Sequence, residues 1–378
     1  MGGYIFLSDS DHTSKTFLRY CLADLSLSGD FQLFGPRSRH SEFSRLWGAE
    51  KVSDSVHSLS DRQNSSGTVQ KLIDLNLDDY LIVPIDYGGL QFLAENLSKL
   101  SLHYRCCPVA EVDLIRFLDD KANIPEIATD LEADYPRDRS LAGMLNTEFV
   151  LIKPRLGSTG SGIVYCNSKK EVASHLAGLS EAQRDDFIMQ EYIAGVDYSY
   201  YAMAAEGEVL VEAGFEIRQL REYGEKARAA VFYMPDEVKA VSRKLVARYA
   251  YSGPISIDYR LDTRLGHEKI VIIEVNPRSG SHSHYFSATF LNMLEVYIRS
   301  GELRSLNWGK LKKSPEFRPT PRGEIWMVSR KRFLLNLFTG LARFDFRCAG
   351  PLIRGYRLQI YSELSRSFRL GLRRVIKR

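Results

Sequence analysis

The feature that most constrains the fold is a pattern of apolar segments that come in pairs around short polar turns. Each segment is short and rich in β-branched and aromatic residues, which predicts antiparallel hairpins. The two pairs are Tyr198–Ala204 with Val209–Phe215, and Pro254–Leu261 with Lys269–Val275. Segments with helical spacing, Glu237–Tyr249 and Ser287–Arg299, accompany them, and together these elements predict an α+β core.

The second hairpin carries oxygen-bearing side chains on one face. Positions 258 and 274 are symmetric about residue 266, so a fold there places Asp258 opposite Glu274, and Asn276 shares the face of Glu274. Apolar neighbours predict burial, where paired carboxylates repel each other unless a cation joins them. Oxygen ligands of this kind suit Mg²⁺. The structural alternative is that Asp258 pairs with Arg260 or Arg278 and that Asn276 only starts a turn.

A glycine-rich loop follows the strand-like segment Phe149–Lys153. Such a loop lets backbone N–H groups approach phosphate oxygens, and the adjacent Lys153 supplies a positive charge. The loop residues are Gly157, Ser158, Thr159, Gly160, Ser161 and Gly162. A single turn of this kind is more often a plain hairpin loop, so the motif gains weight only in combination with others.

A strand that meets a glycine turn and an acidic residue forms a third motif. Its residues are Gln190, Glu191, Tyr192, Ile193 and Asp197. The pattern suits the edge of a nucleobase and ribose site, although a strand that simply meets a turn is the default explanation.

The first 112 residues have a different organisation. Strand-like segments alternate with segments of helical spacing, which predicts an α/β unit with a parallel sheet. The strands are Tyr4–Leu7, Phe31–Phe34 and Tyr80–Ile85, and the helices are Thr16–Leu27, Val69–Leu77 and Leu90–Leu100. Neither a GxGxxG nor a P-loop pattern follows the first strand, so nucleotide binding by this unit is not predicted.

Charge divides the chain unevenly. Residues 318–378 hold 15 Lys and Arg against 3 Asp and Glu, a net of +12, whereas residues 1–317 have a net of −8. We expect this arginine-rich extension to form basic helices that cap the core. Contact with an anionic membrane surface is the alternative. No nucleic-acid motif accompanies the charge, so no nucleic acid is expected as a partner.

Composition indicates the compartment. No window approaches the roughly 18 apolar residues that a membrane span requires, and the first residues lack a basic region ahead of an apolar core. The five cysteines are odd in number and form no CxxC pair, so neither a disulfide framework nor a zinc site is predicted. We expect a cytoplasmic protein, with peripheral contact at the inner membrane surface as the alternative for the extension.

In their order along the chain these motifs resemble those of the ATP-grasp superfamily of ligases. The family has a lysine before a glycine-rich loop, a strand that contacts adenine, and a late metal-binding strand that ends in an Asn-Pro-Arg-like motif, here Asn276-Pro277-Arg278. Asp120-Lys121 also looks like the earlier nucleotide-binding lysine of the family. The last motif is more similar to the carbamoyl-phosphate-synthase and biotin-carboxylase branch than to the D-alanine:D-alanine ligases.

The resemblance implies three regions. These are a pre-ATP-grasp α/β domain over 1–112, an ATP-grasp domain over 113–317, and the arginine-rich extension over 318–378. Within the second region, it implies a glycine-rich loop lobe over about 121–189 and a metal-binding lobe over about 190–317.

The resemblance also implies roles for single residues. Lys121 and Lys153 would hold the ATP phosphates under the loop 157–162, and Arg278 would face the transferred phosphoryl group. The segment 190–193 would line the adenine site and Asp197 would lie near the ribose. The metal ligands would be Asp258, Glu274 and Asn276, with Mg²⁺ as the ion and Mn²⁺ as its alternative.

The chemistry that the resemblance implies is ligation. ATP would activate a small-molecule carboxylate as an acyl phosphate, and an amine would then displace phosphate and form a C–N bond. Two alternatives are a small-molecule kinase on the same fold and a non-catalytic ATP-binding scaffold. Some peptide-forming relatives place an arginine two residues before the metal aspartate, where this chain has Ser256. A homodimer is compatible with the resemblance, but the sequence does not predict one.

Three further residues lie near these motifs and were considered for substrate contacts. His282 and His284 follow the metal strand and could orient the acceptor or act as a base, but hydrogen-bonded scaffolding is the favoured explanation. Arg218 follows a hairpin and could reach an anionic substrate, but a solvated loop is favoured.

Overall fold

The structure is a computed structural model, and its description covers part of the 378 residues. The described ranges are 3–8, 30–35, 56–58, 65–77, 79–157, 162–218, 229–231, 234–264, 269–279 and 324–326. Several sequence predictions lie outside them. These are the helices 16–27 and 287–299, the loop residues 158–161, His282, His284, and the extension 318–378 except for 324–326.

The first sheet has five parallel strands in the order β3-β2-β1-β4-β5. Its elements are β1 Gly3–Leu7, β2 Asp30–Gly35, β3 Val56–Ser58, α4 Ser65–Asp74, β4 Tyr80–Pro84, α5 Tyr87–Leu100 and β5 Arg105–Cys106. Strands β1 and β4 are buried along their whole length, as expected of parallel strands covered on both faces. Helix α5 begins three residues before the predicted start, because Asp86 caps it by accepting a hydrogen bond from the Gly89 N–H at 2.9 Å.

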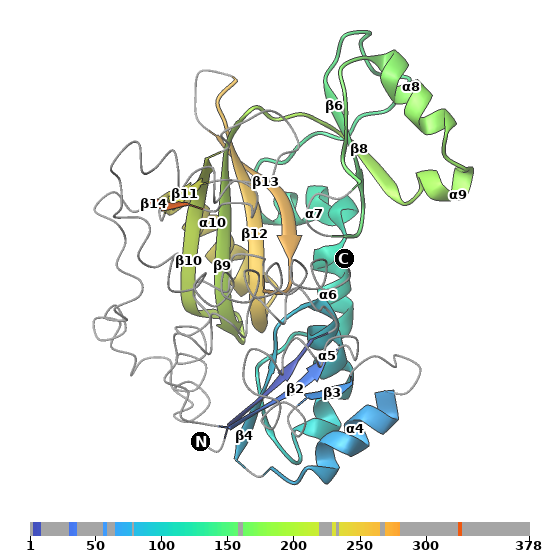
Figure 1. Cartoon of the computed structure of the whole chain (residues 1–378). Coiled ribbons are helices and arrows are strands. Elements are labelled where there is room, and N and C mark those ends of the chain that lie inside the picture. Colours follow the sequence, from blue (N-terminus) through green and yellow to red (C-terminus); the bar gives the residue numbers. More distant parts are fainter. Residues whose placement is uncertain are drawn as a thin grey trace, which may run out of the picture.

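A small antiparallel sheet, β7-β6-β8, forms a separate lobe. Its elements are β6 Val150–Pro154, β7 Val164–Cys166, α8 Lys169–Ala177, α9 Glu181–Arg184 and β8 Phe187–Glu191. Val150, Ile152 and Val172 belong to a hydrophobic core that this lobe does not share with the other two sheets. Figure 1 shows the lobe with α8 and α9 at the upper right, beyond the end of the large sheet.

The largest sheet is antiparallel and has the strand order β13-β12-β9-β10-β11-β14. Its strands are β9 Gly195–Ala205, β10 Glu208–Arg218, β11 Ala229–Val231, β12 Gly253–Asp262, β13 Lys269–Asn276 and β14 Glu324–Trp326. Both predicted hairpins are therefore present, as β9–β10 and β12–β13. The register confirms that Asp258 pairs with Glu274.

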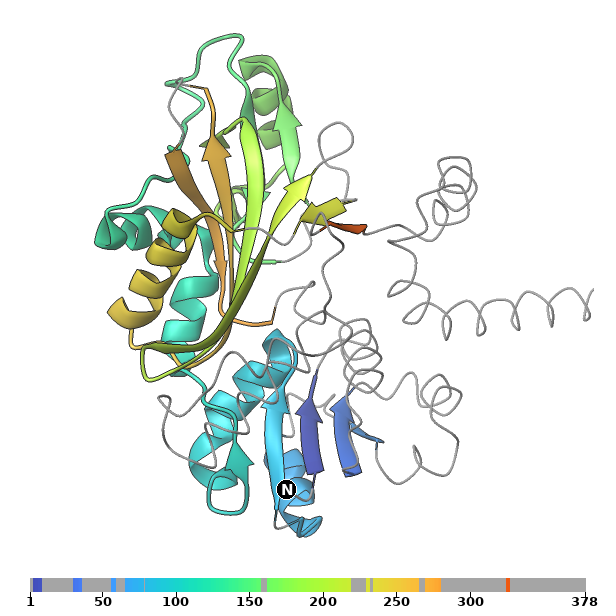
Figure 2. The same cartoon turned by 90° about the vertical axis from the view of Figure 1, so that its left-hand side faces the viewer.

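Helices cover one face of this sheet (Figure 2). They are α6 Val112–Asp119, the 3₁₀ turn η3 Lys121–Asn123, α7 Ile124–Leu131 and α10 Asp236–Arg248. Ile115, Ile127 and Leu245 from these helices share a core with Tyr200 and Ile257 of the sheet. This core holds η3, which carries Lys121, close to the end of β13.

A short connection, residues 192–194, joins β8 of the small lobe to β9 of the large sheet. We call residues 191–195 the hinge segment. Gly195 at its end lies against β12, where an added Cβ would stand 1.7 Å from the carbonyl oxygen of Leu261. Only glycine permits that approach, so the chain enters the large sheet at a fixed point.

Within the described ranges, every helix is too short or too polar to cross a bilayer.

The contact between α5 and β1 gives a test of packing in the first sheet. In Gly89→Ala the new Cβ would lie 2.2 Å from the Leu7 carbonyl oxygen, so the helix must move away from the strand. We expect the free energy of unfolding to fall by about 1–3 kcal/mol, measured by urea denaturation followed by circular dichroism. In the control Gly178→Ala the nearest atom lies at 3.4 Å, so its stability should stay within about 0.5 kcal/mol of wild type. Equal stability of both variants would contradict this packing.

Candidate active site

Two carboxylates face each other inside the large sheet. Asp258 of β12 pairs with Glu274 of β13, and the ladder bulges directly after this pair. The Ser199 hydroxyl of β9 donates to Asp258 Oδ1. Burial raises the pKa of Asp258 to about 8, and the negative charge of Glu274 adds to the effect. Burial also acts on Glu274, but the charge of Lys121 and the Asn276 amide hold its pKa below the usual value.

Lys121 approaches this pair from η3. Its Nζ lies 3.4 Å from Glu274 Oε2 and donates to the Gly157 carbonyl at 3.1 Å. The turn is tied to the end of β6, because Arg155 makes a two-point ion pair with Asp120 and its carbonyl accepts from the Lys121 N–H. Lys121 is therefore held between the glycine-rich loop and the metal strand.

Lys153 reaches the same place from the small lobe. Its side chain is buried, with 4% of the residue exposed, and its Nζ donates to the Ile273 carbonyl at 3.3 Å. Burial lowers the pKa of Lys153 to about 8, against the opposing charge of Glu274. Among the described residues no carboxylate lies within ion-pair distance of Lys153. A buried cation without a counter-charge is suited to an anionic ligand.

Asn276 links the carboxylates to Arg278. Its Nδ2 donates to Glu274 Oε1 at 3.0 Å, and its Oδ1 accepts from Arg278 Nη2 at 2.6 Å. The structural alternative for Asp258 is not observed, because Arg278 contacts Asn276 and Arg260 pairs with Asp197. Asp258, Glu274, Asn276, Lys121, Lys153 and Arg278 thus form one constellation.

The glycine-rich loop begins and ends in conformations that favour glycine. Gly157 has φ +123° and Gly162 has φ +81°. An added Cβ at Gly162 would lie 2.9 Å from the side chain of Pro154, so the loop also requires a small residue there. Ser158, Thr159, Gly160 and Ser161 lie outside the described residues.

Gln190 of β8 presents an unsatisfied acceptor. Its Nε2 donates to Asp138 Oδ1 at 3.2 Å, whereas its Oε1 is buried and has no hydrogen-bond partner. Gln190 pairs with Leu151 and Ile188 pairs with Lys153, so Gln190 and Lys153 lie on the same face of the small sheet. The opposite face carries the core of the small lobe. The unpaired oxygen is therefore on the face that carries Lys153.

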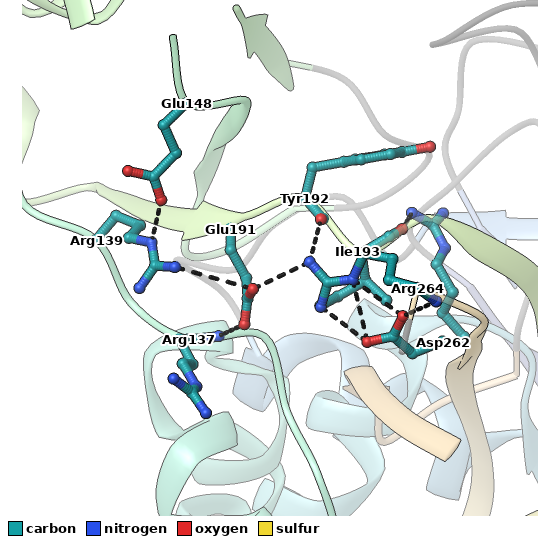
Figure 3. Close-up of polar contacts among 9 residues, drawn as sticks. Arg137, Arg139, Glu148, Glu191, Tyr192, Ile193, Asp262 and Arg264 are labelled. Carbon is teal, nitrogen blue, oxygen red and sulfur yellow. Dashed lines mark hydrogen bonds and ion pairs between the residues drawn. The ribbon is translucent and has the colours of Figure 1, made fainter. Parts of the chain in front are cut away.

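The hinge segment follows directly (Figure 3). The side chain of Glu191 is occupied by protein groups: Oε1 accepts from the Arg137 N–H at 3.0 Å and Oε2 accepts from Arg264 Nη1 at 3.1 Å. The carbonyls of Tyr192 and Ile193 accept from Arg264 and Arg260. The resemblance implied that the segment 190–193 lines an adenine site, and in this structure the carboxylate of Glu191 is engaged by Arg137 and Arg264.

Asp197 and Arg218 are the remaining predicted residues. The Asp197 carboxylate accepts from Arg260 Nε at 2.5 Å, so it is not a free acceptor in this structure. Arg218 ends β10, where it pairs with Ala229 of β11. This position is two strands away from the β12–β13 hairpin in the sheet order, and the side chain of Arg218 lies outside what the structure describes.

Several residues of this region were missed by sequence reasoning. Arg260 and Arg264 alternate with Asp258 and Asp262 along β12 and its turn, and that alternation of charge was a usable signal. Asp119, at the end of α6, gave no such signal. It is a buried carboxylate whose pKa is raised by burial and which lies in the field of Arg278 and Lys121.

The constellation fits a phosphate and a divalent cation. Among the residues that the structure describes, Lys153 has no carboxylate within ion-pair distance, and the Asp258–Glu274 pair offers hard oxygen donors whose negative charges would repel each other without a cation. In the described part of the chain no three His, Cys, Asp or Glu side chains form a metal-binding cluster. Mg²⁺ is commonly held by one or two carboxylates together with substrate phosphates.

Comparison with known families agrees with this geometry. Residues 112–281 match the family model of the ATP-grasp domain. For this part of the chain, the resemblance inferred from the motif order is confirmed. No curated protein sequence matches the chain at a significant level.

Solved structures share the fold at low sequence identity. An L-amino acid ligase from Bacillus licheniformis has a TM-score of 0.56 and 16% identity, over 78% of this chain and 74% of the ligase. The biotin carboxylase domain of a Hydrogenobacter thermophilus 2-oxoglutarate carboxylase, solved with MgADP and bicarbonate, has a TM-score of 0.56 and 15% identity, over 79% and 70%. An Aspergillus clavatus N5-carboxyaminoimidazole synthase, solved with ADP and 5-aminoimidazole ribonucleotide, has a TM-score of 0.54 and 15% identity, over 78% of this chain and 76% of the synthase. At the level of the fold, the expected likeness to the biotin-carboxylase branch is confirmed.

The unpaired charge of Lys153 gives a test of the phosphate site. Lys153→Met replaces a buried ammonium by an apolar chain of similar length, so at pH 7 we expect the free energy of unfolding to rise by about 1–3 kcal/mol. The same change should abolish ATP-dependent turnover, since it removes the cation. Urea denaturation and an ADP-release assay measure the two effects.

The pH dependence of that difference follows from the pKa of Lys153. In the unfolded chain lysine keeps its proton up to its ordinary pKa of 10.5, whereas in the folded protein it loses the proton near 8. The unfolded state therefore binds more protons between these values, and wild-type stability rises with pH across that window. The excess free energy of unfolding of Lys153→Met over wild type should be fully present below about pH 8 and should shrink towards pH 10.5. A difference that stays constant over this range would contradict burial of the charged amine.

Proposed function

We propose that this protein is an ATP-dependent ligase that joins a small-molecule carboxylate to an amine and releases ADP and phosphate. The observation that carries the proposal is the meeting of two partly buried carboxylates with two buried lysines at the junction of three elements. Asp258 and Glu274 come from the large sheet, Lys121 from η3, and Lys153 from the small lobe.

The described residues support a division of roles. Lys121 and Lys153 would bind the phosphates of ATP, and the loop that starts at Gly157 would cover them. Asp258, Glu274 and Asn276 would hold Mg²⁺, which neutralises phosphate charge when it is bound. Gln190 Oε1 would accept a hydrogen bond from the base, which satisfies its buried acceptor.

Arg278 is suited to the transfer step. Its guanidinium is fixed by Asn276 Oδ1, so it adjoins the metal-binding residues in a defined orientation. A planar cation held there would stabilise the negative charge that develops when a carboxylate attacks the terminal phosphoryl group. Such a reaction needs positioning and charge neutralisation, and no protein nucleophile.

Mass spectrometry tests the proposed reaction. Purified protein would be incubated with Mg²⁺, ATP, a pool of amino acids and a cytoplasmic metabolite extract. A product lighter than its two parents by one water, formed together with ADP and phosphate, supports ligation and identifies both substrates. ADP with a phosphorylated metabolite would instead show a kinase, and ATP binding without turnover would show a scaffold.

The metal ligands can be tested through Glu274. Glu274→Gln keeps the size of the side chain and removes the negative charge that faces Asp258. We expect ADP formation to fall by at least about 100-fold, while the far-ultraviolet circular dichroism spectrum is unchanged. The control Glu212→Gln removes a carboxylate on the same sheet that pairs with Arg243, and it should retain activity. Wild-type turnover in Glu274→Gln would exclude the role assigned to Glu274.

The base site can be tested through Gln190. Gln190→Met removes the unpaired acceptor oxygen and keeps the shape of the side chain. The KM for ATP should rise about tenfold, because a hydrogen bond to the base is lost. The free energy of unfolding should change by less than about 1 kcal/mol, because loss of the Nε2–Asp138 hydrogen bond offsets the removal of a buried unpaired oxygen. Steady-state kinetics and urea denaturation measure both quantities. Gln91→Met on α5, whose Nε2 contacts Tyr87, is the matched control. An unchanged KM in Gln190→Met would show that the base lies elsewhere.

A further inference from the structure

The backbone carbonyls of the hinge segment accept hydrogen bonds from the end of β12 and from the turn that follows it. Arg264 Nη1 donates to the Tyr192 carbonyl at 3.0 Å, and Arg260 Nη1 donates to the Ile193 carbonyl at 2.8 Å. The Thr263 N–H donates to the Ala194 carbonyl at 3.4 Å. Three successive carbonyls of the connection are thus turned towards one short stretch of the large sheet.

The opposite side of the hinge presents donors. The peptide bonds are trans, so each N–H points away from the carbonyl of the same peptide unit. The N–H groups of Ile193 and Ala194 therefore point away from the two arginines. Neither N–H has a hydrogen-bond acceptor among the described residues. Ile193 is buried, so its unpaired donor would be satisfied by a ligand.

Both arginines are themselves fixed. Arg264 makes a bidentate pair with Asp262, with Nε and Nη2 at 3.0 and 2.8 Å from its oxygens. Arg260 pairs with Asp197, and its guanidinium lies over the ring of Tyr192 at 5.4 Å from the centroid. A guanidinium with two anchors holds its remaining N–H in a defined direction, which a lysine ammonium does not.

These contacts continue into the small lobe as a row of alternating acidic and basic side chains, which we call the charge ladder (Figure 3). Glu148 Oε1 accepts from Arg139 Nε at 2.5 Å, and Arg139 Nη2 lies 3.9 Å from Glu191 Oε2. The same Glu191 oxygen accepts from Arg264 at 3.1 Å, and Arg264 continues to Asp262. The ladder therefore joins residues before β6, at the end of β8 and after β12.

We propose that Arg264 and Arg260 are positioning residues that orient the hinge backbone for the nucleotide base and join the small lobe to the large sheet. The inference rests on the proposed ATP site. Neither arginine touches the base: each acts through a hinge carbonyl, and Arg264 acts also through Glu191. Loss of Arg264 would release the Tyr192 carbonyl and with it the direction of the Ile193 N–H.

The test is the affinity for MgADP, measured by isothermal titration calorimetry on the full chain. In Arg264→Gln we expect the Kd to rise about tenfold, which corresponds to the loss of a hydrogen bond to a charged group. The midpoint of thermal unfolding, followed by circular dichroism, should stay close to wild type. The combined variant Arg264→Gln with Glu191→Gln should be little weaker than Arg264→Gln alone, because both changes break the same contact.

A matched control separates positioning from general damage. Arg243→Gln breaks another arginine–carboxylate pair, with Glu212 of β10, two strands from β12 in the sheet order, and should leave the Kd unchanged. Arg264→Lys keeps the charge but cannot contact Asp262, Glu191 and Tyr192 together, so its Kd should lie between wild type and Arg264→Gln. If Arg264→Gln does not fold, the Arg264→Lys comparison decides the question alone.

The outcomes are distinct. Equal MgADP affinity in wild type, Arg264→Gln and Arg264→Lys would overturn the positioning role and leave the proposed function intact. A lower unfolding midpoint with unchanged affinity would show a purely structural ion pair and would also overturn it. Failure of the wild-type protein to bind MgADP would overturn the proposed function itself.

Discussion

The centre of the molecule depends on the burial of charge around one strand pair. Asp258 and Glu274 face each other in the β12–β13 ladder, and neither is stable there as an isolated anion. The positive charge of Lys121 offsets part of the free-energy cost of burying the Glu274 carboxylate. Lys153 is also buried, and its ammonium donates to the Ile273 carbonyl of the same strand. Each group makes the burial of its neighbours less costly, so the large sheet, η3 and the small lobe have to meet at this point. The arrangement holds a buried lysine with no ion-pair partner among the described residues, two facing carboxyl groups and an unpaired amide oxygen, and these groups support the proposed magnesium nucleotide site.

Among the described residues, the small lobe and the large sheet are joined by polar contacts and share no hydrophobic core. Val150, Ile152 and Val172 form a core of their own within the small lobe, whereas the helices α6, α7 and α10 pack on the large sheet. What crosses the boundary is the Lys153 ammonium, the hinge segment and the charge ladder that ends at Arg264. Polar contacts of this kind depend on direction and distance, so they fix an orientation with little buried apolar area.

Most of the fold could be predicted from local periodicity, whereas side-chain contacts between residues far apart in the sequence could not. The pairing of Asp258 with Glu274 followed from symmetry about residue 266, but the bulge directly after this pair shifts the rest of the ladder by one residue, which the symmetry did not predict. The start of α5 was missed because its cap depends on the Asp86 side chain, which a count of apolar positions ignores. The functional motifs could be identified because their order along the chain is informative. The partner of Glu191 could not, since Arg264 lies 73 residues away and a sequence with many arginines does not show which one folds back to it.

The two ends of the proposed nucleotide site consist of different kinds of polar group. At the phosphate end the charges of Lys121 and Lys153 are buried, so solvent screens them little and their attraction for phosphate is strong but weakly directional. At the base end the groups are backbone N–H donors and one amide oxygen, which are weak but directional. Directional groups discriminate only if their own positions are fixed, and the hinge has no regular secondary structure of its own between β8 and β9. Arg260 supplies that rigidity from β12, the strand that carries Asp258, and Arg264 supplies it from the turn that follows. In the proposed site, β12 and this turn would therefore set both the place of the phosphates and the direction of the groups that face the base.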